Sequence, residues 1–147
     1  MNQNNQTITL LQAWVQLSAI LKNSRFTKGL SYNEAIIMLH LYEQWQHDGI
    51  GRLSTKEIIT RTGMLKSLVN RTINALEQKG LLERCHPEGD KRILYIRCCH
   101  DNMEAFLKVH DSSLEIARSI EEIIGPEDTA AFIRIVEKIS ASGYQLK

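Results

Sequence analysis

The first fifty residues repeat apolar and polar positions at the spacing of α-helices. Residues 7–23 predict an amphipathic helix, because one stripe gathers the apolar side chains Leu10, Trp14, Leu17 and Leu21, widened by Ile8, Leu11 and Val15. A second helix is predicted over residues 31–46, since Ser31 and Glu34 form a capping box at its start. The Asp48-Gly49 turn separates this helix from the next helical segment.

Two further helical segments lie close together in the chain, with a tight turn between them. Ser54 and Glu57 form a second capping box, which opens a short helix through about Arg61 that ends near Gly63. Residues 65–79 form the next helix. Its apolar arc consists of Leu65, Val69, Thr72, Ile73 and Leu76. Two helices in this order predict a helix-turn-helix.

A β-hairpin is predicted directly after these helices. Residues 81–86 and 92–98 have the composition of strands, and the second alternates apolar with polar positions. The connection Pro87-Glu88-Gly89-Asp90 is rich in turn residues. A hairpin in this position forms the wing of a winged helix-turn-helix.

The C-terminal part is predicted to be helical. Asp101 and Glu104 form a third capping box that opens a helix to about Ile124, and Gly125-Pro126 separates it from a last helix. The expected fold class is mainly α with a small β wing, a winged helix-turn-helix with N- and C-terminal dimerisation helices. We expect one domain over residues 1–147, with residues 52–98 as the DNA-binding part and residues 7–46 and 101–142 as the helical dimerisation scaffold.

The distribution of charge supports this division. The chain as a whole has a formal net charge of +1, but residues 52–97 hold ten Lys/Arg and five Asp/Glu, which gives +5, while the remainder has −4. A basic middle between acidic flanks is typical of a phosphate-binding module on a scaffold that stays off the DNA. A merely solvated basic face explains the charge equally well.

Several classes of protein are disfavoured. No segment approaches the ~18 consecutive apolar residues of a membrane span, and residues 1–6 lack the pattern of a signal peptide. The three cysteines are an odd number without framework spacing, which is typical of reduced thiols. We therefore expect a cytoplasmic protein with no membrane partner. No catalytic motif is present, so neither an enzyme nor a cofactor is expected.

The outward arc of the 65–79 helix carries hydrogen-bonding side chains and no acid: Ser67, Asn70, Arg71, Asn74 and Gln78. Such a face suits the major groove, where Arg pairs with guanine and Asn with adenine. Any soluble helix also has a polar outer face, but the lack of Glu and Lys here favours DNA reading. Residues near the helix start reach furthest into the groove, which favours Ser67, Asn70 and Arg71 over Gln78.

Positive charge also flanks the hairpin turn, where Arg84, Lys91 and Arg92 belong to the predicted wing. Asp90 lies two residues before Arg92, where its carboxylate suits orienting the guanidinium. Charged residues are common at ordinary hairpin tips as well. The complete set of candidate DNA contacts is Ser54, Lys66, Ser67, Asn70, Arg71, Asn74, Arg84, Lys91 and Arg92, with Asp90 as the wing-orienting residue.

Several residues between Leu53 and Arg97 match the sequence pattern of a known protein family. They are Gly63, Ser67, Val69, Arg71, the passage Leu76-Glu77-Gln78-Lys79-Gly80-Leu81-Leu82-Glu83-Arg84, and Asp90-Lys91-Arg92. By these residues the segment resembles the winged helix-turn-helix of the multiple antibiotic resistance regulator (MarR) family. The resemblance implies a homodimer with intertwined terminal helices, a wing that touches the minor groove, and a transcriptional repressor of a pseudo-palindromic double-stranded operator, modulated by a small effector.

The segment departs from the family pattern at several positions. Leu65 stands where the family has an acidic or hydroxyl residue, so the recognition helix lacks a side-chain N-cap. Leu68 replaces a small polar residue and either contacts a thymine methyl or packs locally. Cys98-Cys99 replaces the family's Leu-Thr, which moves the capping role to Asp101.

Three roles remain open for the cysteines Cys85, Cys98 and Cys99: ordinary packing, a redox-responsive thiol, or a metal site with His86, His100 and His110. Adjacent strand residues point to opposite faces, which disfavours the metal, and we expect no metal site. His110 lies on an apolar stripe and is expected to be a hydrogen-bonded core histidine.

The aromatic residues Trp14, Tyr32, Tyr42 and Trp45 either pack in the core or line an effector pocket. The alternative function is a winged-helix protein-interaction module or anti-regulator without DNA binding. The operator, the regulated genes, the effector and the direction of regulation are not encoded in recognisable motifs.

Overall fold

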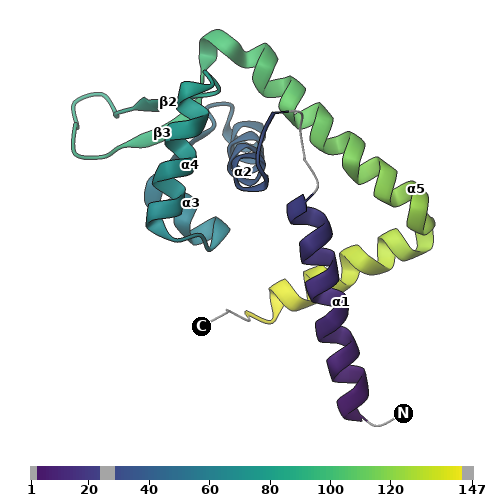
Figure 1. Ribbon diagram of the computed structural model, residues 1–147. Helices are drawn as coiled ribbons and strands as arrows, with labels where there is room; N and C mark the ends of the chain where they lie inside the picture. The colour runs from purple at the N-terminus through teal and green to yellow at the C-terminus, as the bar shows by residue number, and fades with distance from the viewer. Residues whose placement is uncertain (1–2, 24–28, 144–147) are drawn as a thin grey trace. The chain divides into compact units, whose positions relative to one another are not determined.

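The computed structural model describes residues 3–23 and 29–143, apart from the side chain of His100. Its contacts divide the chain into two compact units, Met1–Ser113 and Leu114–Lys147. In chain order (Figure 1) the elements are α1 (Gln3–Asn23), α2 (Tyr32–Asp48), β1 (Arg52–Ser54), α3 (Thr55–Thr62), α4 (Lys66–Gln78), β2 (Leu82–Cys85), β3 (Tyr95–Cys98), the 3₁₀ turn η1 (His100–Asn102) and α5 (Met103–Ala141). The fold class is the predicted one, mainly helical with a small antiparallel sheet.

The starts of α2 and α3 are set by local hydrogen bonds. Ser31 Oγ accepts from Glu34 N at 3.2 Å while Glu34 Oε1 accepts from Ser31 N at 3.2 Å. Ser54 and Glu57 repeat the arrangement at 3.1 and 3.2 Å. Both predicted capping boxes are therefore confirmed. Gly63 ends α3 with φ +70°, a conformation that residues with a Cβ rarely adopt.

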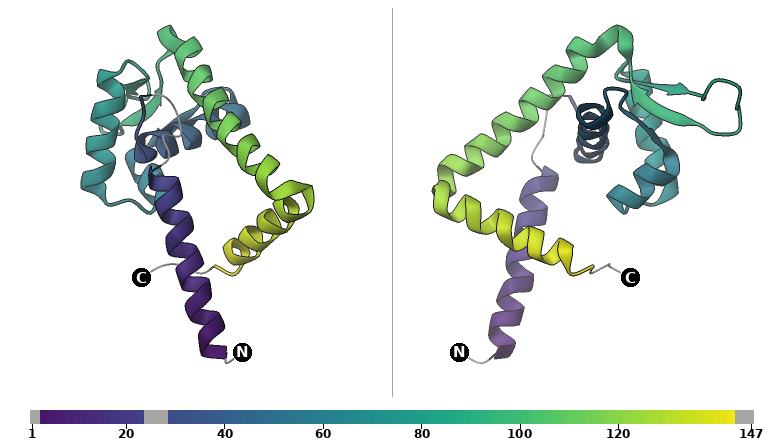
Figure 2. Two further views of the ribbon diagram at one scale, coloured as in Figure 1. Left: turned by 45° about the vertical axis from the view of Figure 1, so that its right-hand side comes forward. Right: turned by 180° about the vertical axis from the view of Figure 1, so that it is seen from behind.

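The sheet has three antiparallel strands in the order β1-β3-β2. β2 and β3 form the predicted hairpin, but both strands are shorter than the sequence pattern suggested, which leaves a longer loop between them. In Figure 1 and in the right view of Figure 2 this loop projects beyond the helices. β1 was not predicted, because three residues are too few to show alternation. Its Leu53 is fully buried and pairs with Ile96 of β3.

α2 lies at the centre of the core of the first unit. It contacts α3, α4, β1 and β3. Ile37 of this helix is fully buried, whereas Leu39 is exposed. Fully buried partners from the other elements are Ile58, Val69, Ile73, Leu76, Ile96 and Phe106.

α5 differs from the prediction at its start and agrees with it at its break. Asp101 lies inside η1, whose N-cap is Cys99 without a side-chain cap bond, so the expected N-cap position of Asp101 is wrong. The reason is that the 3₁₀ turn precedes the α-helix, which places Asp101 within a helical turn instead of before one. Gly125 has φ 85° and ψ 167°, which interrupts the helix as predicted, and Figure 2 shows the bend.

A partly buried ion pair joins α4 to the start of α2. Lys79 Nζ donates to Glu34 Oε2 at 2.6 Å and to Gly29 O at 2.9 Å. Burial alone would raise the pKa of Glu34, but the hydrogen bonds from Lys79 and Ser31 outweigh it and hold the pKa below its ordinary value of 4.5. The ionised carboxylate therefore stabilises the fold.

Lys79→Met is expected to lower the free energy of unfolding at pH 7 by about 1–3 kcal/mol, because Glu34 is left buried without its partner. The wild-type contribution is present above pH 4.5 and is lost as the pH falls through the lower folded pKa. Urea denaturation at pH 7 and pH 3 checks both points. The variant should lose less stability on acidification than the wild type, and an equal loss would contradict the assignment.

Candidate nucleic-acid interface

α4 separates an apolar face from a polar one. Val69, Thr72, Ile73 and Leu76 are buried, as the predicted arc required, whereas Leu65 is 75% exposed. The side chains of the predicted reading face are exposed: Ser67, Asn70, Arg71, Asn74 and Gln78. Lys66, which belongs to the wider set of candidate DNA contacts, is exposed as well. The packing therefore leaves this face free for a partner.

The electrostatics of the α4 start suit an anionic partner. Its N-cap Leu65 makes no side-chain cap bond, and its first turn holds no acidic residue. The free N–H groups and the positive end of the helix dipole there favour negative charge. Lys66 and Arg71 add formal charge to the same exposed face.

The wing carries its charges on the projecting loop. Lys91 and Arg92 are exposed, and the Arg92 side chain is 92% exposed. Asp90 Oδ1 accepts from Arg92 N at 2.9 Å and from Arg92 Nε at 3.3 Å. These two contacts are what the wing-orienting role of Asp90 requires, and the role itself remains a proposal.

Two predicted contact residues have other partners in the structure. Ser54 Oγ accepts the cap bond of α3, and the residue is only partly exposed. Arg84 was placed with the wing charges, but it lies in β2 against α4. Its Nε donates to Glu77 Oε2 at 3.2 Å and its Nη2 donates to Asn74 Oδ1.

Glu77 is the residue of this interface that the sequence analysis missed. It lies three residues after Asn74, so the two side chains neighbour each other on α4. The landmark passage from Leu76 to Arg84 contains both the acid and the arginine. The residue types were therefore visible in the sequence, but the contact across to β2 was not.

The cysteines do not form a cluster. Cys98 is buried in the core, where desolvation raises the pKa of its thiol, and its Sγ lies 3.4 Å from Met103 Sδ. Cys85 pairs with Tyr95 and Cys98 with Leu82, so the two cysteines are not opposite each other. Among the described residues no group of three His, Cys, Asp or Glu is placed to hold a metal ion. A raised thiol pKa disfavours the redox role for Cys98.

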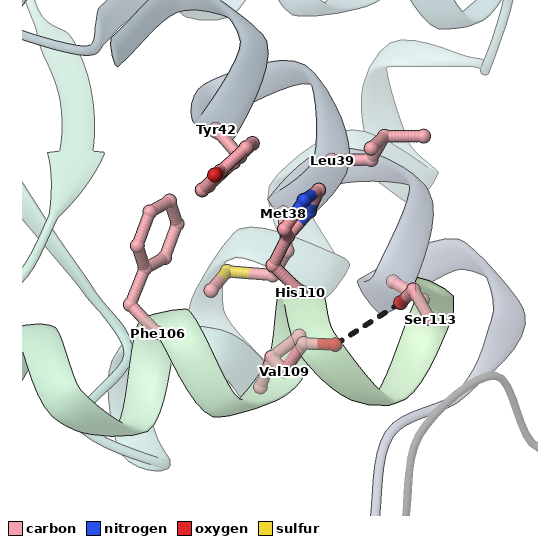
Figure 3. A pocket seen from close by; sticks show the side chains of 8 residues that line it. Met38, Leu39, Tyr42, Phe106, Val109, His110 and Ser113 are labelled. Carbon is pink, nitrogen blue, oxygen red and sulfur yellow. Dashed lines mark hydrogen bonds between the residues drawn. The ribbon is translucent and has the colours of Figure 1, made fainter. Parts of the chain in front are cut away.

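A small cavity of about 10 Å³ lies between α2 and the first turns of α5. Figure 3 shows Tyr42, His110, Phe106 and Met38 around it, and the rings of Tyr42 and His110 stack in contact with centroids 3.5 Å apart. Among the described residues no group hydrogen-bonds the buried Nδ1 atom of His110, so the protein's own described groups do not supply the partner that was expected there. The volume suits one water, which would pair with that atom.

The other aromatic candidates are divided between the surface and this region. Trp14 of α1 is 60% exposed, while Tyr42 and Trp45 pack against each other with ring centroids 5.8 Å apart. Of the four, Tyr42 lines the cavity. Trp14 and Tyr32 line a different hollow beside α1.

Large apolar side chains are exposed on the terminal helices. On α1 these are Ile8, Leu10, Leu11, Trp14, Val15 and Ile20, and on α5 within the second unit they include Ile123, Phe132, Ile133, Ile135 and Ile139. No described helix has the length and hydropathy needed to cross a membrane. Contiguous apolar faces of this extent are typical of subunit interfaces.

Comparisons with known proteins agree with this geometry. Residues 28–93 match the sequence model of the MarR family. The same fold occurs in AbsC, a MarR family transcriptional regulator from Streptomyces coelicolor, at 20% identity and TM-score 0.73 over 97% of this chain and 95% of that one. BldR from Sulfolobus solfataricus matches at 17% identity and TM-score 0.74, over 97% and 99%.

A third structure, BpsR from Bordetella bronchiseptica, matches at 18% identity and TM-score 0.70, over 92% of this chain and 98% of that chain. No curated protein sequence matches the chain. The sequence match to the MarR family covers residues 28–93, a little under half of the chain, and nearly the whole chain shares the fold of these solved structures.

Proposed function

We propose that this protein is a homodimeric repressor that binds a pseudo-palindromic operator and responds to a small effector. The observation that carries the proposal is the exposed face of α4, which presents Lys66, Ser67, Asn70, Arg71 and Asn74 beside a projecting basic wing. A helix with such a face fits the major groove, and the wing loop reaches the adjacent groove or phosphates. A regulator of transcription must reach the chromosome, so we expect it in the cytoplasm.

The dimer is supported by the exposed apolar faces of α1 and α5. A two-fold interface formed by these helices would hold two copies of α4 at a fixed separation. The operator would then consist of two half-sites with centres ~10 bp apart or a multiple of that distance. Neither helix has enough apolar contacts within a single chain to bury these residues.

The effector class is proposed from two proteins that share the fold. The cavity between α2 and α5, at about 10 Å³, has room for one water at most and is not itself proposed as the effector site. BpsR, which shares the fold, is regulated in its DNA binding by 6-hydroxynicotinic acid, and the organohalide-sensing regulator RdhR has a 2,4-dichlorophenol-bound form. Small hydroxylated aromatic compounds are therefore the first probes to titrate against the protein–DNA complex.

Two alanine variants test the DNA contacts. Arg71→Ala is expected to weaken binding to the selected operator by about 1–3 kcal/mol and to relax preference at one base pair in each half-site, because a bidentate contact to guanine is lost. Arg92→Ala is expected to weaken binding to many sequences alike and to reduce the salt slope, because the wing contacts phosphate or a narrow groove.

Selection of duplexes from a random pool, followed by fluorescence anisotropy at several salt concentrations, measures both effects. The wild type should select two-fold symmetric sequences and lose affinity linearly in log salt. If neither variant changes affinity while both stay folded and dimeric, or if the wild type binds no duplex, the protein is instead a winged-helix protein-interaction module.

A further inference from the structure

Arg84 connects the sheet to the recognition helix by two hydrogen bonds. Its Nη2 donates to Asn74 Oδ1, and its Nε donates to Glu77 Oε2 at 3.2 Å. Asn74 and Glu77 lie on the same face of α4, while Arg84 belongs to β2. The guanidinium is therefore held between a carboxylate and an amide of the helix that reads DNA.

The chemistry of this contact determines how the Asn74 amide is oriented. A guanidinium only donates hydrogen bonds, so the atom of Asn74 that faces Arg84 has to be the carbonyl oxygen. The amide nitrogen then lies on the other side of the group, with its two N–H donors directed away from Arg84. Asn74 is exposed on the arc that also carries Asn70 and Arg71, so these donors are accessible to a partner.

We propose that Arg84 is a positioning residue that directs the N–H donors of Asn74 toward DNA and thereby selects guanine over adenine at the base pair that Asn74 faces. The proposal rests on the DNA-binding function proposed above. An unrestrained asparagine pairs with adenine by accepting from N6 and donating to N7. With its oxygen directed toward Arg84 and one of its two lone pairs engaged by the cation, Asn74 is a poor acceptor for adenine N6, whereas guanine O6 and N7 both accept from its N–H donors.

The surroundings of Arg84 are those of an orienting group rather than of a phosphate contact. Its side chain is 35% exposed, against 92% for Arg92 of the wing. Glu77 lies within ion-pair distance and offsets its charge. A phosphate contact would require a freer cation.

The test compares the base preferences of lysine and alanine variants with those of the wild type. Selection of duplexes with the Asn74→Ala variant identifies the base pair that Asn74 reads, because the base preference is lost at that position of the operator. At that position the wild type is expected to prefer guanine over adenine by about 10-fold. Arg84→Lys keeps the charge but lacks the planar pair of nitrogens, so the preference should fall to within about 3-fold.

Arg97→Lys is the matched control. Arg97 lies in β3, and its side chain is also 35% exposed. Its Nε donates to Glu83 Oε1 at 2.6 Å, and Glu83 belongs to β2 and not to α4. This variant loses a comparable ion pair of the same sheet. It should retain the wild-type preference for guanine.

Asn74→Asp supplies a second test that does not depend on the folding of the Arg84 variant. The aspartate keeps an oxygen for Arg84 but has no N–H donor, so affinity for the guanine-containing site should fall by about 10-fold or more while the melting temperature is maintained.

An unchanged guanine preference in Arg84→Lys, with or without a loss of thermal stability, would overturn the proposal and leave Arg84 a structural residue. An equal change in Arg97→Lys would overturn it too. If the wild-type protein binds no duplex, the proposed function itself is contradicted. If the wild type binds DNA and Arg84→Lys keeps the same guanine preference, only the proposed role of Arg84 is contradicted.

Discussion

Leu10→Asp is expected to convert the protein from a dimer into a monomer at micromolar concentration. Leu10 is 69% exposed on α1, within the apolar face that we assign to the subunit interface. In a two-fold interface each substitution occurs twice, and each places a carboxylate where an apolar side chain was buried. The free energy of dimerisation becomes less favourable by about 3–6 kcal/mol, which is twice the ~1.5–3 kcal/mol of one buried leucine. This change weakens the dimer by ~10²–10⁴-fold.

Sedimentation and light scattering measure the change, with Gln12→Asp as the control. Gln12 lies two residues away on the same helix and is also exposed, so the same charge is added without removing an apolar contact. It should leave the dimer intact if position 12 lies outside the interface. A Leu10→Asp protein that remains dimeric would show that α1 does not form the interface.

The same variant has a consequence for DNA binding. A monomer engages one half-site at a time, so it loses the gain in effective concentration that links the two contacts of a dimer. We expect affinity for the full operator to approach that for an isolated half-site. Full-operator affinity at the wild-type level in a monomeric variant would contradict the paired arrangement of the two α4 helices.

Phe106→Ala is expected to lower the free energy of unfolding by about 3–5 kcal/mol, because the ring is 1% exposed and its removal leaves a large cavity. Phe106 lies in the first turns of α5 and packs on Tyr42 of α2 with ring centroids 5.8 Å apart. It is therefore the side chain that fixes the start of α5 to the core of the winged helix. Its loss should also loosen the cavity that contains His110.

Chemical denaturation measures this effect in a series of variants. Phe106→Leu keeps most of the apolar volume and should cost less than half as much as Phe106→Ala. Leu107→Ala, at the neighbouring position, is the control, because Leu107 is 37% exposed and should cost about 1 kcal/mol or less. Equal losses at positions 106 and 107 would contradict the packing of α5 on α2.

The sequence by itself determined the helices of the winged domain and the face of the recognition helix. Ser31 with Glu34, and Ser54 with Glu57, act over three residues, so their effect is visible in the chain without knowledge of the fold. The buried arc of α4 follows from helical periodicity alone, which also identifies the opposite face as the exposed one that we propose for DNA binding. Gly125 likewise breaks α5 by its own backbone conformation.

The tertiary structure alone decided the features that depend on residues far apart in the chain. β1 exists because Leu53 pairs with Ile96 and is buried there, which three residues of local pattern do not reveal. Arg84 was assigned to the wing by its position in sequence, but the packing of β2 against α4 gives it Asn74 and Glu77 as partners. His110 was expected to be hydrogen-bonded, yet the rings around it supply no partner for Nδ1. Burial and partner choice are set by packing between elements, and local propensity carries no record of that packing.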